Sequence, residues 1–246
     1  MKQIADGMWM GRGTDVNWML VRDGSDLTLV DAGYPADIAR LEADIRSIGH
    51  NLGDIGAVLV THAHIDHIGG LQGLLSRHDV PVLMAAQELP LATGEQEKPG
   101  SRSELMRMAW RPNVAMWLGR VMRSGALHDE PLRGAQTWSD GGPLDLPGRP
   151  VPVASPGHTP GHTAYFFPEH GVLATGDALV TAHPLTAAHT PHLLPSVFNA
   201  SDAGALGALD ALATVDADVI VPGHGDVWRG PIARAVDLAR SVPTSI

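Results

Sequence analysis

The chain has 246 residues, of which 44% are hydrophobic and 18% charged, as expected for a globular protein with a sizeable core. Its formal net charge of −10 argues against a nucleic-acid partner, because binding to a polyanion requires a basic face. The chain contains no cysteine, which excludes disulfides, a thiolate nucleophile and thiolate-bound zinc. Any bound metal must therefore have nitrogen and oxygen ligands.

The sequence also predicts that the protein has no membrane partner. No segment approaches the ~20 consecutive apolar residues that a membrane-spanning helix requires. The first residues, MKQIADGMWMGRG, lack the apolar core and the small-residue cleavage site of a signal peptide. We therefore expect a cytoplasmic protein.

Three short strand-like segments begin the chain, around residues 8–11, 17–21 and 27–30, and turn residues such as Asp23-Gly24 separate them. This spacing predicts a meander of antiparallel strands joined by hairpins. The third segment runs into Asp31-Ala32-Gly33, which places a carboxylate at a strand end before a glycine turn. From the residues alone, Asp31 is equally a functional carboxylate and a cap or turn residue.

Strands and helices then alternate. Residues 35–50 have apolar positions at helical spacing, with a proline at the start and a glycine at the end. A short apolar strand follows at 57–60, a second helix at 71–77 and another strand at 80–84. This alternation predicts an α/β layered fold, in which sites usually lie at the ends of strands.

The segment THAHIDH, residues 61–67, directly follows the strand at 57–60 and carries three histidines and one carboxylate. On extended or loop backbone, His62 and His64 would point to the same side and could reach one metal ion. Asp66 and His67 are adjacent and would diverge from each other, which suggests a second ion or a second role. The segment is predicted to be a metal site.

The pattern changes between about residues 92 and 137. Apolar residues recur at helical spacing around 105–109 and 114–122, with a break near Pro112, which predicts a helical insert in a single domain spanning 1–246. The face of these helices that bears Met and Trp either packs on the core or lines an apolar substrate pocket. Core packing is the favoured interpretation.

The second half of the chain follows a loop expected at 138–143 and repeats one theme. Three strand-like runs each end in a polar segment that contains glycine, which lets the backbone approach closely while side chains converge. These polar segments are SPGHTPGH at 155–162, ATGDA at 174–178 and VPGHGD at 221–226. Helices are expected at about 201–213, with Ser201 as the N-cap, and at about 230–240.

Together these motifs resemble those of the metallo-β-lactamase superfamily of metallo-hydrolases. The five motifs occur in order: Asp31 in LVDAG, the cluster at 61–67, His158 in SPGHTPGH, Asp177 in ATGDA and His224 in VPGHGD. The resemblance spans most of the chain. It implies an αββα sandwich, in which two mixed sheets face each other with helices outside and a two-metal site lies at the edge where the sheets meet.

The resemblance also implies a ligand set. One metal would be bound by His62, His64 and His158, and the other by Asp66, His67 and His224, with Asp177 bridging them. Asp31 would support the ligand loops without binding metal. His162 would be buried near the site, whereas a proline-rich loop could bring other histidines to the border of the pocket, namely His183, His189 and His192.

The donor set favours two Zn²⁺ ions, with iron and manganese as alternatives. Two such ions ~3.5–4 Å apart can share a water and lower its pKa toward about 7, which provides a bridging hydroxide as nucleophile. Asp66 is expected to be catalytic, because it would both bind metal and orient the attacking hydroxide. We therefore expect a hydrolase of a small-molecule ester, thioester or lactone, with an apolar group of the substrate held by the insert.

Departures from known relatives narrow this expectation. Related β-lactamases normally lack an aspartate at the position of Asp177, and glyoxalase II enzymes carry a glutathione-binding helical domain, whereas 22 residues follow His224 here. Two alternatives stay open. One is a mononuclear iron oxygenase similar to persulfide dioxygenases, which would use His62, His64 and Asp177; the other is a metal-binding module without catalysis.

Overall fold

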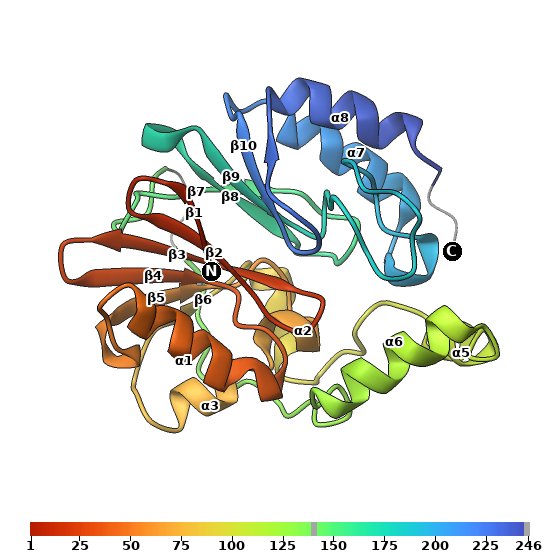
Figure 1. Cartoon of the computed structure of the whole chain (residues 1–246), viewed down its shortest axis with the longest axis horizontal. Coiled ribbons are helices and arrows are strands. Elements are labelled where there is room, and N and C mark those ends of the chain that lie inside the picture. Colours follow the sequence, from red (N-terminus) through yellow and green to blue (C-terminus); the bar gives the residue numbers. More distant parts are fainter. Residues whose placement is uncertain (139–141, 244–246) are drawn as a thin grey trace.

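The computed structural model describes residues 1–138 and 142–243, so the middle of the loop expected at 138–143 lies outside the described residues. Two β-sheets face each other, and helices cover the outer face of each sheet (Figure 1). Both sheets are mixed, because each contains parallel and antiparallel pairs. The αββα sandwich that the sequence predicts is confirmed.

The first sheet contains six strands that follow one another in chain order. It is antiparallel from β1 to β4 and parallel from β4 to β6. The strands are β1 (Lys2–Ala5), β2 (Met8–Arg12), β3 (Asn17–Asp23), β4 (Asp26–Val30), β5 (Ile55–Leu59) and β6 (Val82–Leu83). The predicted meander is β2 to β4. Strand β1 was not predicted, because its four residues KQIA show too little apolar alternation.

The second sheet contains five strands in the order β11-β10-β9-β8-β7. Only β9 and β10 run parallel, and the other neighbours are antiparallel. The strands are β7 (Val151–Ala154), β8 (Thr163–Phe167), β9 (Val172–Gly176), β10 (Val219–Pro222) and β11 (Trp228–Arg229). The runs expected before the three glycine-bearing segments are β7, β9 and β10, and the short edge strand β11 was not predicted.

The helices lie where the sequence places them, with short additions. Ser201 caps α7 as predicted, since its hydroxyl accepts the backbone N–H of Gly204 at 3.0 Å. The α-helices are α1 (Ile38–Ser47), α2 (Ile65–Ile68), α3 (Leu71–Leu75), α4 (Leu89–Ala92), α5 (Arg102–Arg107), α6 (Pro112–Arg123), α7 (Asp202–Leu212) and α8 (Ile232–Ser241). The 3₁₀ turns are η1 (Pro35–Asp37), η2 (Leu52–Asp54), η3 (Ala86–Glu88), η4 (Pro168–His170) and η5 (Ser196–Phe198).

Alternation along β3 shows how the first sheet packs on both faces. Met19 and Val21 belong to the buried cluster between the two sheets, which includes side chains of β8 and β9. Trp18 and Leu20 belong to the cluster on the other face, beneath α1 and α3. Both faces of the sheet are therefore covered, as the layered architecture requires.

The second sheet is covered in the same way by α7 and α8 (Figure 1). Leu209 and Leu212 of α7 and Val236 of α8 pack with Leu173 of β9 and Ile220 of β10. Burial on this scale fixes the two helices against the outer face of the sheet.

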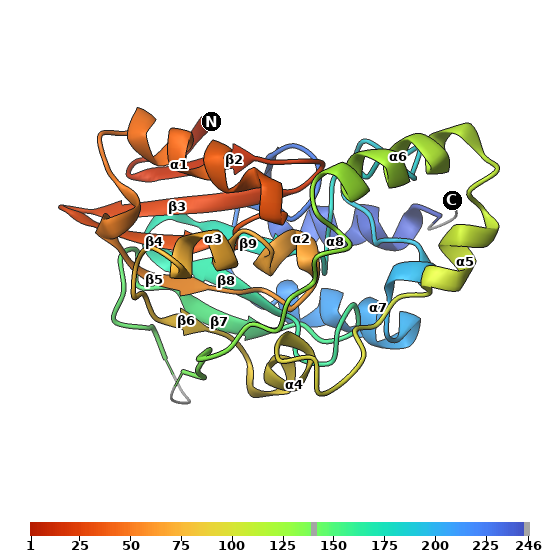
Figure 2. The same ribbon diagram turned by 90° about the horizontal axis from the view of Figure 1, so that it is seen from below.

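Helices α5 and α6 project from one end of the sandwich (Figures 1 and 2). The predicted break falls at the right residue, because α6 begins at Pro112, where the missing N–H is not needed. Among the described residues, no helix is long and apolar enough to cross a membrane.

A matched pair on α7 tests the packing of the outer layer. Leu209 is fully buried, whereas Leu206 is 49% exposed on the same helix. We expect Leu209→Ala to lower the free energy of unfolding by about 2–5 kcal/mol, because it leaves a cavity. Leu206→Ala should change it by less than about 0.5 kcal/mol. Urea unfolding followed by circular dichroism measures both, and equal losses would contradict the assignment.

Candidate metal centre

Seven histidine and aspartate side chains come together at one end of the sandwich. The neighbouring parallel strands β4 and β5 end there, as do β9 and β10, because parallel strands share a carboxyl edge. The residues and their places are His62 and His64 after β5, Asp66 and His67 on α2, His158 between β7 and β8, Asp177 after β9 and His224 after β10. Both sheets therefore supply this cluster, which we call the His/Asp cluster.

The backbone of residues 61–67 differs from the expectation in its second half. Residues 65–68 form the helical turn α2, so Asp66 and His67 do not lie on extended backbone. Successive residues of a helix are separated by about 100° around its axis, whereas those of a strand point to opposite faces. The prediction that these two side chains diverge is wrong, since His67 Nε2 lies 3.8 Å from Asp66 Oδ2.

Three ring nitrogens meet on one side of the cluster. His62 Nε2 lies 3.1 Å from both His64 Nδ1 and His158 Nε2, and the last two are 2.9 Å apart. Four ligands at ~2.0–2.1 Å in tetrahedral geometry are roughly 3.3 Å from one another, so the three nitrogens are spaced much as zinc ligands are.

The hydrogen bonds of these rings fix where their protons lie. Thr61 Oγ1 donates to Asp31 Oδ2 at 2.8 Å, so at the contact of 3.0 Å between Thr61 Oγ1 and His62 Nδ1 the ring nitrogen is the donor. The carbonyl of Pro99 accepts from His64 Nε2 at 3.1 Å. Each inward nitrogen of His62 and His64 then carries a lone pair, and these lone pairs point at one another. A cation between them would remove this repulsion.

The other side of the cluster is rich in carboxylates. His224 Nε2 lies 3.1 Å from Asp177 Oδ2 and 3.5 Å from Asp66 Oδ2, and His67 Nε2 lies 3.4 Å from Asp177 Oδ1. The outer nitrogens donate elsewhere, His67 Nδ1 to Asp31 Oδ2 at 2.8 Å and His224 Nδ1 to the carbonyl of Asp15 at 2.5 Å. The inward nitrogens therefore face the carboxylates, with His224 Nε2 hydrogen-bonded to Asp177 Oδ2, and both would have to lose a proton to bind a metal ion.

Asp177 lies between the two sides. Its Oδ1 faces His67, and its Oδ2 approaches His224 and, at 3.5 Å, His158 Nε2. Among the described buried atoms, Asp177 Oδ1 and His67 Nε2 are without a hydrogen-bond partner. Leaving such atoms unpaired is costly, so the arrangement fits a metal ion that contacts both. Gly223 is required nearby, because a Cβ there would lie 2.1 Å from Asp177 Oδ1.

The two sides differ in their protonation. Burial lowers the pKa of His62 and His158 well below the usual value, so both rings are neutral and able to bind metal. Burial also opposes charge on His67 and His224, but the neighbouring carboxylates, above all those of Asp31 and Asp177, prevail. They raise the pKa of His67 well above its usual range and that of His224 to about 9. This side therefore stabilises positive charge.

Asp31 connects the ligand loops at the end of β4. Its carboxylate accepts the N–H and the hydroxyl of Thr61 at 2.9 and 2.8 Å, and it holds the ring of His67. Its φ of 58° is unusual for a residue other than glycine, and such conformations concentrate at functional sites. This carboxylate is not one of the converging groups that could hold a metal.

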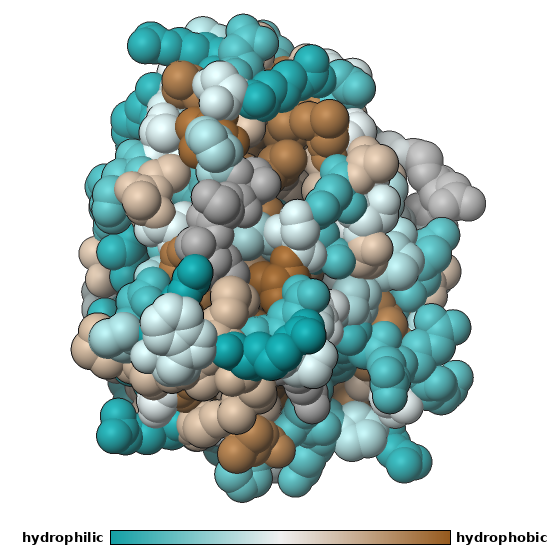
Figure 3. Space-filling view, turned by 90° about the vertical axis from the view of Figure 1, so that its right-hand side faces the viewer, coloured by the Kyte–Doolittle hydropathy of each residue, from teal (hydrophilic) through white to brown (hydrophobic). Residues whose placement is uncertain are grey.

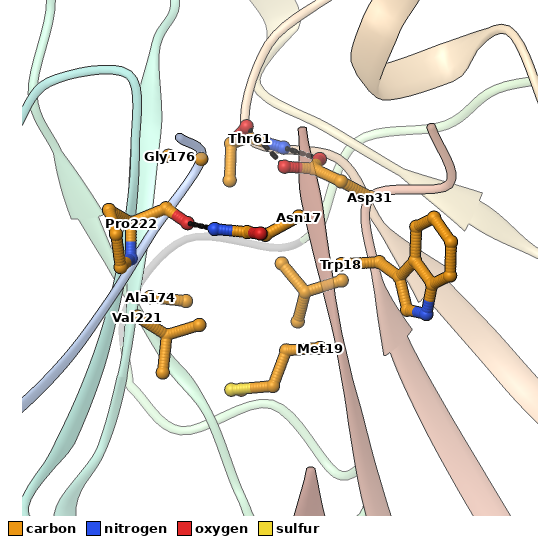
Figure 4. Close-up of a pocket in the computed structure, with 11 residues that line it drawn as sticks. Asn17, Trp18, Met19, Asp31, Thr61, Ala174, Gly176, Val221 and Pro222 are labelled. Carbon is orange, nitrogen blue, oxygen red and sulfur yellow. Dashed lines mark hydrogen bonds between the residues drawn. The ribbon is translucent and has the colours of Figure 1, made fainter. Parts of the chain in front are cut away.

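Hydrogen bonds of Asn17 connect the two sheets. Figure 4 shows Asn17 of β3 donating to the carbonyl of Pro222 at 2.9 Å, opposite the bonds between Asp31 and Thr61. Asn17 also donates to the carbonyl of Gly225 at 2.8 Å. Asn17, Pro222, Asp31 and Thr61 border a cavity of about 10 Å³, the size of one water molecule. The loop that carries His224 is thus anchored to the first sheet.

Glu88 was missed by the sequence analysis. It is fully buried, and its carboxylate accepts the N–H of Ala63 at 2.7 Å, the hydroxyl of Thr159 at 2.6 Å and the N–H of Gly161 at 2.7 Å. Burial raises the pKa of Glu88, and these three hydrogen bonds oppose that shift. The side chain therefore ties the loop of His62 and His64 to the loop of His158. A lone acid in the apolar run LMAAQELPLA was the available signal.

His162 is buried beside the cluster, as expected, but both of its nitrogens are engaged. Its Nδ1 contacts Ser155 Oγ at 2.9 Å, and its Nε2 accepts the N–H of Asp177 at 3.0 Å. Burial lowers the pKa of His162 to about 3, so the ring is neutral. His162 therefore positions the backbone of Asp177.

The three histidines of the proline-rich loop have different surroundings. His183 borders the pocket over the cluster, and its ring lies 5.2 Å from that of His224. His192 is buried and bonds to Thr186 Oγ1 at 3.0 Å and to a backbone carbonyl. His189 is exposed.

The fold and this cluster define a metal-binding αββα protein. The family model of the metallo-beta-lactamase superfamily matches residues 11–224, and the chain belongs to that superfamily. Among solved structures, a metallo-beta-lactamase family protein from Thermus thermophilus matches with a TM-score of 0.64 and 24% identity, over 96% of this chain and 79% of that one. Rm3 metallo-beta-lactamase matches with a TM-score of 0.68 and 19% identity, over 98% and 90%. These two structures show the shared fold.

Similar sequences include two curated proteins. The probable metallo-hydrolase YflN of Bacillus subtilis (strain 168) is 27% identical over 203 residues, which are 80% of this chain and 74% of that protein. The hydroxyacylglutathione hydrolase of Halorhodospira halophila is 34% identical over 162 residues, or 66% of this chain and 46% of that protein. Membership of a superfamily of metallo-hydrolases supports the conclusion that this protein is an enzyme.

Replacing Glu88 tests whether it positions the ligand loops. We expect Glu88→Ala to lower metal affinity about 10–100-fold, as loss of a supporting partner commonly does. Glu88→Gln keeps one acceptor oxygen and should lose less. Competition with a chromophoric chelator measures affinity, and the exposed Glu95→Ala in the same segment is the control. Unchanged affinity in a folded Glu88→Ala protein would contradict the role.

Proposed function

We propose that the protein is a hydrolase that uses two divalent metal ions to cleave a small-molecule ester, thioester or lactone. One ion would be held by His62, His64 and His158, the other by Asp66, His67 and His224, and Asp177 would contact both. The observation that carries this proposal is the convergence of lone pairs and buried unpaired atoms from both sheets. Zn²⁺ suits these donors best, and iron or manganese would also be accepted.

The residues of the cluster then have separate tasks. When bound, the two ions would supply an activated water as nucleophile and a Lewis acid for the oxygen of the scissile group. Asp66 borders the pocket on the carboxylate side and is half-buried, so it can accept a hydrogen bond from the attacking water and orient it. Asp31 and Glu88 hold the loops in place, which keeps the reacting groups aligned at no further entropic cost.

Hydrolysis is favoured over the alternatives by the second group of ligands. A mononuclear iron oxygenase would use His62, His64 and Asp177, and would not need the second group of converging donors, Asp66, His67 and His224. A metal-binding module without catalysis would not require Asp66 to border an open pocket. The similarity to a hydroxyacylglutathione hydrolase supports cleavage of an acyl bond.

Metal content tests the two-ion centre directly. We expect purified protein to contain about two divalent ions per chain, because both groups of donors are complete. Removal by a strong chelator should abolish hydrolysis of a panel of esters, thioesters and lactones, and added Zn²⁺ should restore it. Elemental analysis and oxygen consumption provide the measurements. A content of one iron per chain, together with oxygen-dependent turnover, would contradict the hydrolase proposal and support the oxygenase alternative.

Asp66→Ala tests the catalytic carboxylate. We expect the rate to fall by several orders of magnitude and the second ion to be lost or weakly held, because the residue serves both functions. The exposed Asp237→Ala on α8 is the matched control and should leave rate and metal content unchanged. Normal turnover with two ions in Asp66→Ala would show that the assignment is incorrect.

A further inference from the structure

The His/Asp cluster opens into a pocket with a volume of about 390 Å³, which lies in the range of small-molecule sites. One wall consists of cluster residues, including His64, Asp66, Asp177 and His224. The opposite wall consists of α5 and α6 with the flanking residues around 98–100 and 126–129, and of the loop that precedes α7. Figure 3 views this end of the molecule, where patches of apolar surface lie in the upper part, near the centre and at the bottom of the face.

The wall opposite the cluster is apolar. Trp117 and Val121 of α6 are buried, and Trp117 makes an edge-to-face contact with Phe198 at 5.9 Å between ring centres. Met122 of α6 and Leu127 just beyond it are 41% and 73% exposed at the pocket. The helical insert therefore does more than pack on the core, which was the favoured prediction. Its apolar face also lines the pocket.

The charges of this wall compensate each other. Among the described lining residues outside the cluster, the charged ones are Lys98 and Asp129, and their side chains form an ion pair at 2.5 Å. A lysine that is already paired offers little attraction to a carboxylate on the substrate. The pocket therefore offers an apolar surface next to the reacting groups, with no excess of cationic charge for an acidic substrate.

From this arrangement we infer that the substrate carries an apolar chain on the scissile group and that the α5–α6 wall holds this chain. The inference rests on the proposed hydrolase function and specifies the substrate for it. The chain can belong to the acyl half or to the alcohol half of an ester, since both are attached to the group that reacts at the cluster. An exposed apolar rim of Met106, Met122 and Leu127 matches a chain that enters from solvent.

Two ester series distinguish these halves. The first contains ethyl esters of straight-chain acids from acetate to decanoate, and the second contains acetate esters of straight-chain alcohols from ethanol to decanol. Burial of each methylene should raise kcat/KM by roughly threefold to fourfold until the pocket is full. We expect this rise in one series at least, and the series that shows it identifies the half that is held.

Two exposed methionines of α6 provide a matched pair of variants. Met122 borders the pocket, whereas Met116 is 62% exposed and does not border it. Met122→Glu places a charge in the apolar wall and should flatten the dependence on chain length. Met116→Glu should leave it unchanged. The metal content of both variants is measured in parallel, so that loss of the cluster is not mistaken for loss of the pocket.

A binding measurement separates this inference from the proposed function. Calorimetric titration of the metal-loaded protein with straight-chain carboxylates from acetate to decanoate should show an affinity that increases with chain length. If no ester, thioester or lactone is hydrolysed but affinity increases in this way, the hydrolase proposal fails and the inference of an apolar pocket is retained. If esters are hydrolysed at rates independent of chain length, or if affinity is independent of it, the inference is overturned.

Discussion

The constraint on which the structure depends is electrostatic. Nitrogen lone pairs of the buried His62 and the partly buried His64 point at each other across 3.1 Å, and a buried oxygen of Asp177 has no hydrogen-bond partner among the described residues. No fold gains stability from such an arrangement by itself, because unpaired buried acceptors cost free energy. The arrangement persists because other groups fix the outer atoms of each ring. A divalent cation is the species that such a site stabilises.

Much of the fold could be predicted from the sequence, because its strands and helices carry clear local signals. The alternation before residue 84 and the glycine-bearing strand ends indicate an α/β layered fold, and Pro112 marks the start of α6. Some elements shorter than about five residues escaped prediction, among them β1, β11 and α2, since so few positions show no periodicity, whereas β6, β7 and β10 were expected from their short apolar runs. Missing α2 had a consequence for the site, because it led to the wrong prediction that the side chains of Asp66 and His67 diverge.

Part of the candidate site could likewise be predicted from the sequence, and part could not. The histidines and aspartates proposed as metal ligands have chemically distinctive side chains, so their motifs are visible in the sequence. Glu88 and Lys98 were not found, because their roles depend on partners that are distant in the chain. Glu88 bonds to Thr159 and Gly161, which are more than seventy residues away. Only the folded structure shows which buried carboxylate has which donors, and the same holds for the pocket beside α6.

The positions of the ligands along the chain have a thermodynamic consequence. His64 and His158 are separated by 94 positions, and they come from loops that follow strands of different sheets. An ion held by both would link the halves of the sandwich as a covalent cross-link does, by restricting the unfolded chain. Its binding free energy would then be part of the folding free energy. A bound ion would therefore couple the two halves of the sandwich, so that they unfold as one cooperative unit.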